Sequence, residues 1–210
     1  EGIKFSHGKF VTIDGVKVWA QRLSYVGEIG FELYTNIDES KKLFLAIIKE
    51  GKNHDLSPCG AHAMDIMRME SGFLHWGHDI SPEENQYQAG LKFAISYKKN
   101  INFVGKEALL KIKDQNPTKS LAMMVLKDNR PGEPLLPHEE PIYLDDKIMG
   151  RTTSGNYSFN FKKNISFGYV NSGNSIEDLI NKNLSIEVEK KKYPVTIIKK
   201  PLNQKNIKNI

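Results

Sequence analysis

The chain has 210 residues, of which 39% are hydrophobic and 10% aromatic, a composition that supports one sizeable domain or two small ones. The sequence contains no run of about 18 apolar residues, which excludes a membrane-spanning helix. The net charge is +5, but the lysine clusters lie at an expected hairpin and in the tail, without interleaved aromatic residues. This distribution argues against nucleic-acid binding and favours a polyanionic small-molecule ligand over it.

Cys59 is the sole cysteine, so a disulfide framework is impossible and a reducing compartment is expected: the cytoplasm, or the mitochondrial matrix in a eukaryote. Its place in the first turn of an expected helix would favour a thiolate, but a small buried residue is the commoner role of a free cysteine. The N-terminal EGIKFSHGKF has neither the apolar region of a signal peptide nor an initiator Met. We therefore expect a fragment or a processed piece.

The first part of the chain has the alternation of β-strands. Residues 9–13 and 16–20 alternate, and Asp14-Gly15 between them is a strong hairpin signal. Further strands are expected at 21–24 and 30–34. They flank the segment YVGEIG, whose two glycines permit positive φ or close backbone approach.

Two helices are expected next. The first starts at Asp38 and ends at Gly51, with a buried stripe of Leu43, Phe44, Ile47 and Ile48. Because strands and helices intermix here without regular βαβ repetition, the fold class is predicted to be α+β.

The second helix has a clear start signal, with Ser57 as cap and Pro58 at the first helical position, and it should end at Gly72. Its apolar stripe is predicted to be Ala61, Met64 and Met67, while Asp65 and Arg68 share one face. A loop dense in aromatic and ionisable groups follows, and such loops often carry binding sites.

The second half changes from a strand at Leu91–Tyr97 and a short helix at Gly105–Lys113 to a series of short strands after a polar linker at 114–118. These strands are predicted at 121–126, 141–144, 147–153, 165–170, 184–188 and 193–198. Their regular spacing indicates a small β-barrel or sandwich.

Glu32 and Arg68 are the two charged candidates in the first half. On its strand, Phe31 should point into the core and Glu32 the other way, where its carboxylate could accept two parallel hydrogen bonds from an amidine-like edge. Arg68 could bind a carboxylate or a ring carbonyl through its planar fork. Chemistry alone favours a solvated strand glutamate and a surface ion pair with Asp65.

The segment His75-Trp76-Gly77-His78-Asp79 offers two readings. A metal site would need more ligands than the two histidines and the aspartate. Trp76 could stack on a planar ligand, although packing into the core is the commoner role of a tryptophan. In GRTTSG, Gly150 and Gly155 suggest a strand that enters a tight turn, and the P-loop spacing is missing.

These stretches together resemble one family. YVGEIGFELY, DIMRMESGFLHWGHDISPEENQYQAGL and GRTTSGNYSFNFKKNISFGYV resemble the aminomethyltransferase (glycine-cleavage T-protein) family in order and spacing, over nearly the whole chain. HWGHDISPEEN, QAGL and FVGKEAL are most similar to the folate-binding C-terminal region of sarcosine and dimethylglycine dehydrogenases. The resemblance implies that residues 1–116 are the later part of a folate-binding α+β domain, 117–200 a small C-terminal antiparallel β-barrel, and 201–210 a mobile tail.

The resemblance also implies a cofactor and a site. The family binds tetrahydrofolate and makes 5,10-methylenetetrahydrofolate from a one-carbon unit carried on an amine. Glu32 falls where the family holds the pterin ring by its amino-pyrimidine edge. Tyr25 and Arg68 match positions that line the same pocket, and Trp76 matches an aromatic position in the loop beside it. The resemblance thus reverses the preference for a solvated Glu32 and a surface Arg68.

The family's catalytic aspartate belongs to an N-terminal half with no counterpart here, so no catalytic residue is expected and catalysis by this chain alone should be weak or absent. Without a G-x-G-x-x-G fingerprint, FAD is expected only in a separate domain of the parent enzyme. The expected partners are folate, a small amine-derived one-carbon donor and the missing half or a dehydrogenase domain, with neither nucleic acid nor membrane and with no metal. Two alternatives stay open: a demethylase that moves a methyl group from a sulfonium compound to folate, and a non-catalytic assembly module.

Overall fold

The computed structural model describes residues 2–171, 173 and 176–205, which form two compact units. The first unit comprises the chain up to Ser71 together with the segment that starts at Asn203, and the second runs from Gly72 to Leu202. Among the described residues, no helix is both long and apolar enough to cross a membrane. The domain boundary expected at residue 116 stays a prediction.

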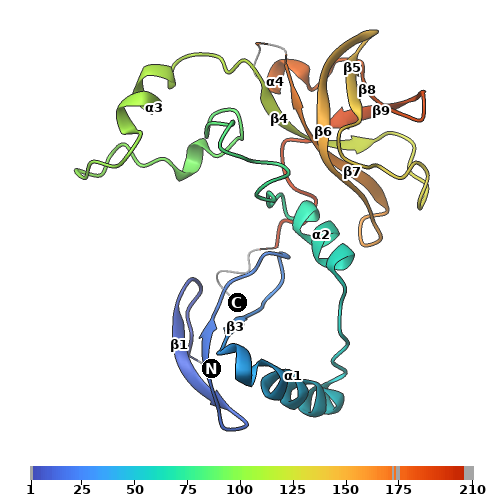
Figure 1. The fold of residues 1–210 in the computed structure, drawn as a ribbon. Coiled ribbons are helices and arrows are strands. Elements are labelled where there is room, and N and C mark those ends of the chain that lie inside the picture. Colours follow the sequence, from blue (N-terminus) through green and yellow to red (C-terminus); the bar gives the residue numbers. More distant parts are fainter. Residues whose placement is uncertain (1, 172, 174–175, 206–210) are drawn as a thin grey trace. The chain divides into compact units, whose positions relative to one another are not determined.

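The first unit contains a three-stranded antiparallel sheet in the order β1-β2-β3 (Figure 1). Its strands are β1 (Gly8–Ile13), β2 (Val16–Gln21) and β3 (Glu32–Tyr34). The predicted hairpin is confirmed, and both Asp14 and Gly15 have positive φ, as a tight two-residue turn requires. The strand expected at 21–24 is wrong, because the Leu23 N–H donates back to the Gln21 carbonyl and turns the chain away from the sheet.

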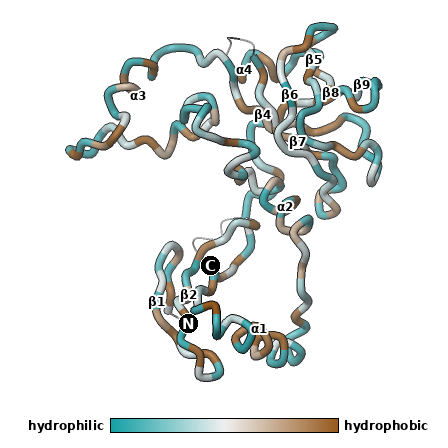
Figure 2. Tube along the Cα trace, in the orientation of Figure 1, coloured by the Kyte–Doolittle hydropathy of each residue, from teal (hydrophilic) through white to brown (hydrophobic). Residues whose placement is uncertain are grey.

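Helix α1 (Ile37–Gly51) is amphipathic, as the alternation of hydrophobic and hydrophilic residues along it in Figure 2 shows. Leu43 is buried against Val16 and Val18 of β2, so the helix and the hairpin share one small core. Two details of the expected helix are wrong: Asn36, not Asp38, precedes the first turn, and Phe44 lies exposed. A short 3₁₀ turn at Lys52–His54 follows.

Helix α2 (Ala61–Glu70) starts later than expected, after Gly60, so the predicted cap at Ser57 is wrong. The expected apolar stripe is also wrong, since Met64 is exposed. The buried positions are Ile66, Arg68, Met69 and Glu70. The predicted end at Gly72 is confirmed by its positive φ of 73°. Cys59, expected to be buried, is exposed.

In the second unit, the stretch before the barrel is mostly irregular. The strand expected at Leu91–Tyr97 is wrong: a 3₁₀ turn forms at Lys92–Ala94, where Ala94 and Ile95 donate to carbonyls three residues back. The predicted short helix is confirmed as α3 (Lys106–Ile112). A further short helix, α4 (Ile176–Leu179), was not expected from the sequence.

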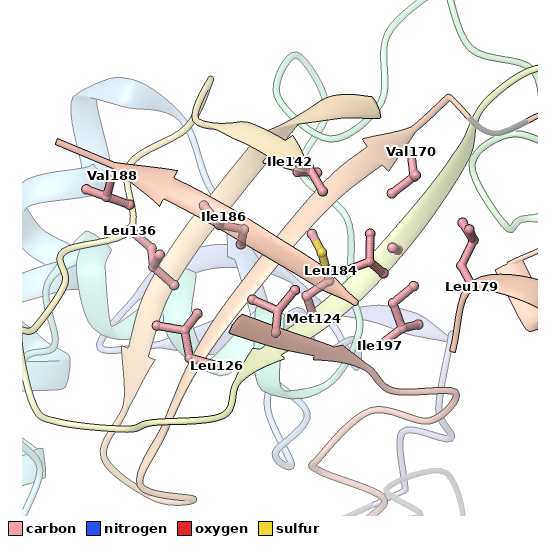
Figure 3. Packing of buried hydrophobic residues seen from close by; sticks show 12 residues of the cluster. Met124, Leu126, Leu136, Ile142, Val170, Leu179, Leu184, Ile186, Val188 and Ile197 are labelled. Atoms are coloured by element: carbon pink, nitrogen blue, oxygen red, sulfur yellow. The ribbon is translucent and has the colours of Figure 1, made fainter. Parts of the chain in front are cut away.

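The rest of the second unit is a closed six-stranded barrel with neighbours in the order β4-β7-β6-β5-β8-β9, all antiparallel. The strands are β4 (Ser120–Leu126), β5 (Pro141–Leu144), β6 (Lys147–Ser158), β7 (Lys163–Val170), β8 (Leu184–Val188) and β9 (Lys191–Ile197). Each strand predicted from residue 121 onward is confirmed, and the barrel is confirmed over the sandwich. Figure 3 shows side chains from several strands, among them Met124, Ile142 and Ile186, gathered in the barrel core.

Strand β6 is longer than expected, and its glycines have a different role from the predicted turn. A Cβ on Gly150 would lie 1.8 Å from the carbonyl oxygen of Tyr169 on β7, and one on Gly155 would lie 2.4 Å from that of Leu136. The two glycines therefore let other backbone segments approach β6 closely. Between them, the pairing with β7 shifts register between Thr152 and Ser154, which leaves Thr153 as the extra residue of a β-bulge.

Candidate functional site

The loop that carries Tyr25 is fixed by its glycine. Gly27 has a φ of 71°, and a Cβ there would lie 2.0 Å from Oγ of Ser71, which directly follows α2. The Ser71 hydroxyl donates to the Val26 carbonyl at 3.5 Å, and Nδ2 of Asn203 donates to the Gly27 carbonyl at 3.3 Å. Gly27 thus has both the positive φ and the close backbone approach that were expected of this segment. The Tyr25 loop lies against the end of α2.

The tail segment contributes to this arrangement. The Asn203 backbone N–H donates to the Glu70 carbonyl at 2.8 Å, and its side chain also donates to the Ser71 hydroxyl at 3.2 Å. The Lys205 ammonium pairs with Glu28 at 2.6 Å. Of the tail expected to be mobile, residues 201–205 include these two hydrogen-bonded side chains, and residues 206–210 lie outside the described residues.

Arg68 is buried in the first unit, with 1% of its side chain exposed. Its Nε donates to Oδ1 of Asp65 at 2.9 Å, and its Nη2 lies 2.8 Å from the same oxygen. The prediction of an ion pair between Arg68 and Asp65 is therefore confirmed, but the prediction that Arg68 lies on the surface is wrong. A buried guanidinium held by a neighbouring carboxylate is a preorganised group, which suits a binding site better than a mobile surface arginine does.

Glu32 lies at the start of β3, and the Tyr34 hydroxyl donates to its Oε2. This hydrogen bond, together with burial and the Glu32 charge, raises the pKa of Tyr34. Residues two apart on a strand share a face, so the sequence spacing could have indicated this pair. Phe31, expected in the core, is 53% exposed, because β3 begins only after it.

Trp76 belongs to the second unit and is 66% exposed, so packing into the core is excluded for it. It lies in a compact turn from His75 to Ile80. The turn is closed by backbone hydrogen bonds from the Asp79 N–H to the His75 carbonyl at 2.8 Å and from the Gly77 N–H to the Ile80 carbonyl at 2.8 Å. An exposed indole on a closed turn is available for stacking.

Asp79 anchors this turn to the barrel and is fully buried. Its Oδ1 accepts hydrogen bonds from the hydroxyls of Thr153 at 2.5 Å and Ser154 at 2.8 Å, and its Oδ2 accepts one from the His75 N–H at 2.9 Å. Asp79 was expected only as a possible metal ligand, and its role as an anchor was not predicted from the sequence. The two hydroxyl donors lie 74 and 75 positions away along the chain, so no local pattern reports them.

A charged cavity of about 590 Å³ lies beside this turn in the second unit. Its wall includes His78, Glu84, Lys119, Arg151 and Tyr169. Two ion pairs, Lys119 with Glu84 and Arg151 with Glu139, each at 2.6 Å, neutralise much of its charge internally. Among the described residues, no group of three or more His, Cys, Asp or Glu side chains is placed to hold a metal ion.

Two family models together match most of the chain. Residues 1–99 match the model described as the GCVT N-terminal domain, and residues 119–203 match the glycine cleavage T-protein C-terminal barrel domain. The second match coincides with the six-stranded barrel of β4 to β9.

The chain is similar to a dehydrogenase, to an oxidase and to an aminomethyltransferase. Dimethylglycine dehydrogenase of Homo sapiens, a mitochondrial protein, is 33% identical over 200 residues, which are 95% of this chain and 22% of that protein. The 4-methylaminobutanoate oxidase (formaldehyde-forming) of Paenarthrobacter nicotinovorans is 31% identical over 96% of this chain and 24% of its own length. An aminomethyltransferase of Symbiobacterium thermophilum is 36% identical over 79% of this chain and 44% of its own length.

A solved structure has the same fold. The crystal structure of the glycine cleavage system aminomethyltransferase T from Bartonella henselae matches with a TM-score of 0.81 and 21% identity, covering 97% of this chain and 54% of that one. The chain thus spans about half the length of the aminomethyltransferases and about a quarter of the length of the oxidase and the dehydrogenase that it matches.

Proposed function

Because this chain belongs to the aminomethyltransferase (glycine-cleavage T-protein) family, we propose that it binds tetrahydrofolate for one-carbon transfer. In this proposal it is the C-terminal portion of an enzyme that converts tetrahydrofolate to 5,10-methylenetetrahydrofolate with a one-carbon unit from an amine. The similarity to dimethylglycine dehydrogenase over 95% of the chain supports a parent of the sarcosine or dimethylglycine dehydrogenase type.

The observation that carries the proposal is the carboxylate of Glu32 beside Tyr34. A pterin presents an amino group and a ring N–H side by side, and a carboxylate matches these two donors with its two oxygens. Oε2 of Glu32 already accepts the Tyr34 hydroxyl, which holds the carboxylate in place, and each carboxylate oxygen has room for more than one donor. The group present therefore fits the edge of the cofactor.

Three further residues are proposed to contact folate. Tyr25 lies in the loop that packs at Gly27 against Ser71, Arg68 is paired with Asp65, and the exposed ring of Trp76 offers a stacking surface. We assign none of them a proton-transfer role. The part of the family fold that carries the catalytic aspartate is proposed to come from the N-terminal half, and FAD from a dehydrogenase domain of the parent.

The proposal places the protein in the cytoplasm, or in the mitochondrial matrix of a eukaryote, where the exposed Cys59 stays reduced. Its partners there are folate, a small amine that donates the one-carbon unit, and the N-terminal half.

Titration calorimetry of the 210-residue chain with tetrahydrofolate tests the proposal. We expect micromolar binding, and Glu32→Gln should weaken it by about 1.5–3 kcal/mol, the value of a hydrogen bond to a charged group, or roughly 10- to 150-fold. Glu50→Gln is the matched control, since Glu50 is an exposed glutamate of α1 in the same unit, and it should leave the affinity unchanged.

Two results would contradict the proposal. If wild type and Glu32→Gln bind tetrahydrofolate with equal affinity, Glu32 is not part of the binding site. If neither the chain nor the chain extended by the N-terminal half of a relative binds folate at millimolar concentration, the chain is an assembly module instead.

A further inference from the structure

The bulge in β6 brings two neighbouring hydroxyls to one carboxylate. Consecutive residues of a regular strand point to opposite faces, so Thr153 and Ser154 would not both reach the same group. Thr153 is the unpaired residue of the bulge, and the hydroxyls of both residues donate to Oδ1 of Asp79. Re-aiming a side chain is a recognised effect of a bulge, and here it completes a binding site for the Asp79 carboxylate.

A second strand holds the backbone of the same residue. The hydroxyl of Tyr169 on β7 donates to the Asp79 carbonyl at 2.9 Å. Burial above all, together with the charges of Glu84 and Asp79, raises the pKa of Tyr169, so this hydroxyl stays protonated and remains a donor. The structure therefore holds Asp79 by both its side chain and its main chain.

The Asp79 side chain also holds the first residue of the turn that carries Trp76. Its Oδ2 accepts the N–H of His75, the residue directly before Trp76, and the turn carries a bridge between Trp76 and Ile80. Two neighbouring histidine rings, His75 and His78, lie with their centroids 4.4 Å apart in the same turn. The exposed indole is thus mounted on a turn whose only fully buried residue is the anchored carboxylate.

We propose that Asp79, through the Thr153 and Ser154 hydroxyls of the β6 bulge, is a positioning residue that fixes the Trp76 ring for stacking on a planar ligand. The inference rests on the proposed function for the identity of that ligand, folate, but not for the mechanical link between Asp79 and Trp76. A preorganised aromatic surface loses less conformational entropy on binding than a mobile one, so loosening the anchor weakens binding without removing any ligand contact.

The mechanical link is tested without ligand. Trp19→Phe leaves Trp76 as the sole tryptophan, and time-resolved fluorescence anisotropy then reports the local motion of its ring. In this background, Asp79→Asn and Thr153→Val should increase the fast local depolarisation at temperatures where the fold is intact. Thr153→Ser keeps the hydroxyl and should leave the motion of the Trp76 ring as it is in the Trp19→Phe background.

Thr152→Val is the matched control for a merely structural effect. Thr152 is buried at the same bulge, but its hydroxyl donates to the Pro137 carbonyl and does not contact Asp79. It should lower the melting temperature and leave the motion of Trp76 unchanged. If Thr152→Val and Thr153→Val change the melting temperature alike and neither changes the motion of Trp76, the positioning role is overturned.

Folate titrations test the functional consequence. Asp79→Asn should weaken tetrahydrofolate binding up to about tenfold, as expected when one additional side chain must be immobilised on binding. The same substitution in a Trp76→Ala background should cause no further loss, because its effect acts through the ring. Additive losses would overturn the inference. If wild type does not bind folate in any form, the proposed function fails, and the anisotropy measurement still decides whether Asp79 fixes Trp76.

Discussion

Arg68 contacts Asp65 through a single carboxylate oxygen: Nε and Nη2 of the arginine both lie within 2.9 Å of Oδ1 of Asp65. The two ends of this pair differ in exposure, because the arginine side chain is buried while about a third of the aspartate side chain reaches solvent. The aspartate could be hydrated if its partner were lost. The guanidinium has much less access to water, so the loss of the Asp65 charge would cost the arginine more than the loss of Arg68 would cost the aspartate.

Asp65→Asn should therefore destabilise the first unit by about 1–3 kcal/mol, because the buried guanidinium loses a charged acceptor. Urea unfolding followed by circular dichroism gives the change as a shift of the midpoint at constant slope. Asp55→Asn, in an exposed position after the 3₁₀ turn at Lys52–His54, is the control and should stay within about 0.5 kcal/mol of wild type. Equal shifts for the two variants would show that the pair contributes nothing.

Gly27→Ala should loosen the Tyr25 loop. The positive φ strains an alanine, and its Cβ would overlap the Ser71 hydroxyl, so a cost of about 1–3 kcal/mol is expected. Tetrahydrofolate affinity, measured by calorimetry, should fall with stability. Gly30→Ala is the matched control in the same loop, since its nearest atom is the Leu23 carbonyl oxygen at an ordinary 3.6 Å. A Gly30→Ala variant as impaired as Gly27→Ala would contradict this account.

The Glu84–Lys119 pair should make stability depend on pH. Burial opposes ionisation of Glu84, but hydrogen bonds from Lys119 and Ser81 and the Lys119 charge outweigh it and lower the pKa of Glu84 below its ordinary value of 4.5. A lowered pKa in the folded state gives stability that is present above the unfolded pKa and is lost as the pH falls through the folded pKa.

Glu84→Gln should therefore lower the melting temperature at pH 7, and the difference from wild type should shrink as the pH falls below about 4.5. Thermal scans between pH 3 and pH 7 measure this difference. Glu83→Gln, an exposed neighbour, is the control and should show little difference at any pH. A gap between wild type and Glu84→Gln that stays constant over this range would refute the ionic contribution.

Gly150→Ala should be among the most damaging single changes in the barrel. Its Cβ would lie 1.8 Å from a backbone oxygen of β7, which cannot rotate away as a side chain can. The expected cost is at or above the upper end of the roughly 1–3 kcal/mol typical of overpacking. Gly60→Ala, with no atom within 4 Å of its Cβ, should change stability far less in the same urea titration.

Strands with short, regular sequence signals were predicted well. The hairpin at Asp14-Gly15 and all six barrel strands follow from alternation and turn residues, which are local properties. Predictions failed where tertiary context decides between local alternatives. Residues 91–97 alternate as a strand does, but in the described structure a 3₁₀ turn forms there. The stripe expected on α2 lay on the wrong face of the helix. Ile66 and Met69 are buried in place of Met64, and the charged Arg68 and Glu70 are buried beside them.

The roles of individual side chains divide in the same way. The pattern of residues by itself determined the α+β class and the six short strands of the second half, since these depend on periodicity, and the motifs read along the chain indicated the family. The pattern left a barrel and a sandwich open, and the strand pairing decided for the closed barrel. Only the tertiary structure decided that Arg68 is buried, that Trp76 is exposed and that Asp79 is anchored by Thr153 and Ser154. Burial and hydrogen bonding are set by what folding brings together. The Thr153 and Ser154 hydroxyls reach the Asp79 carboxylate across 74 and 75 positions, and such distant donors leave no signal in the sequence around Asp79.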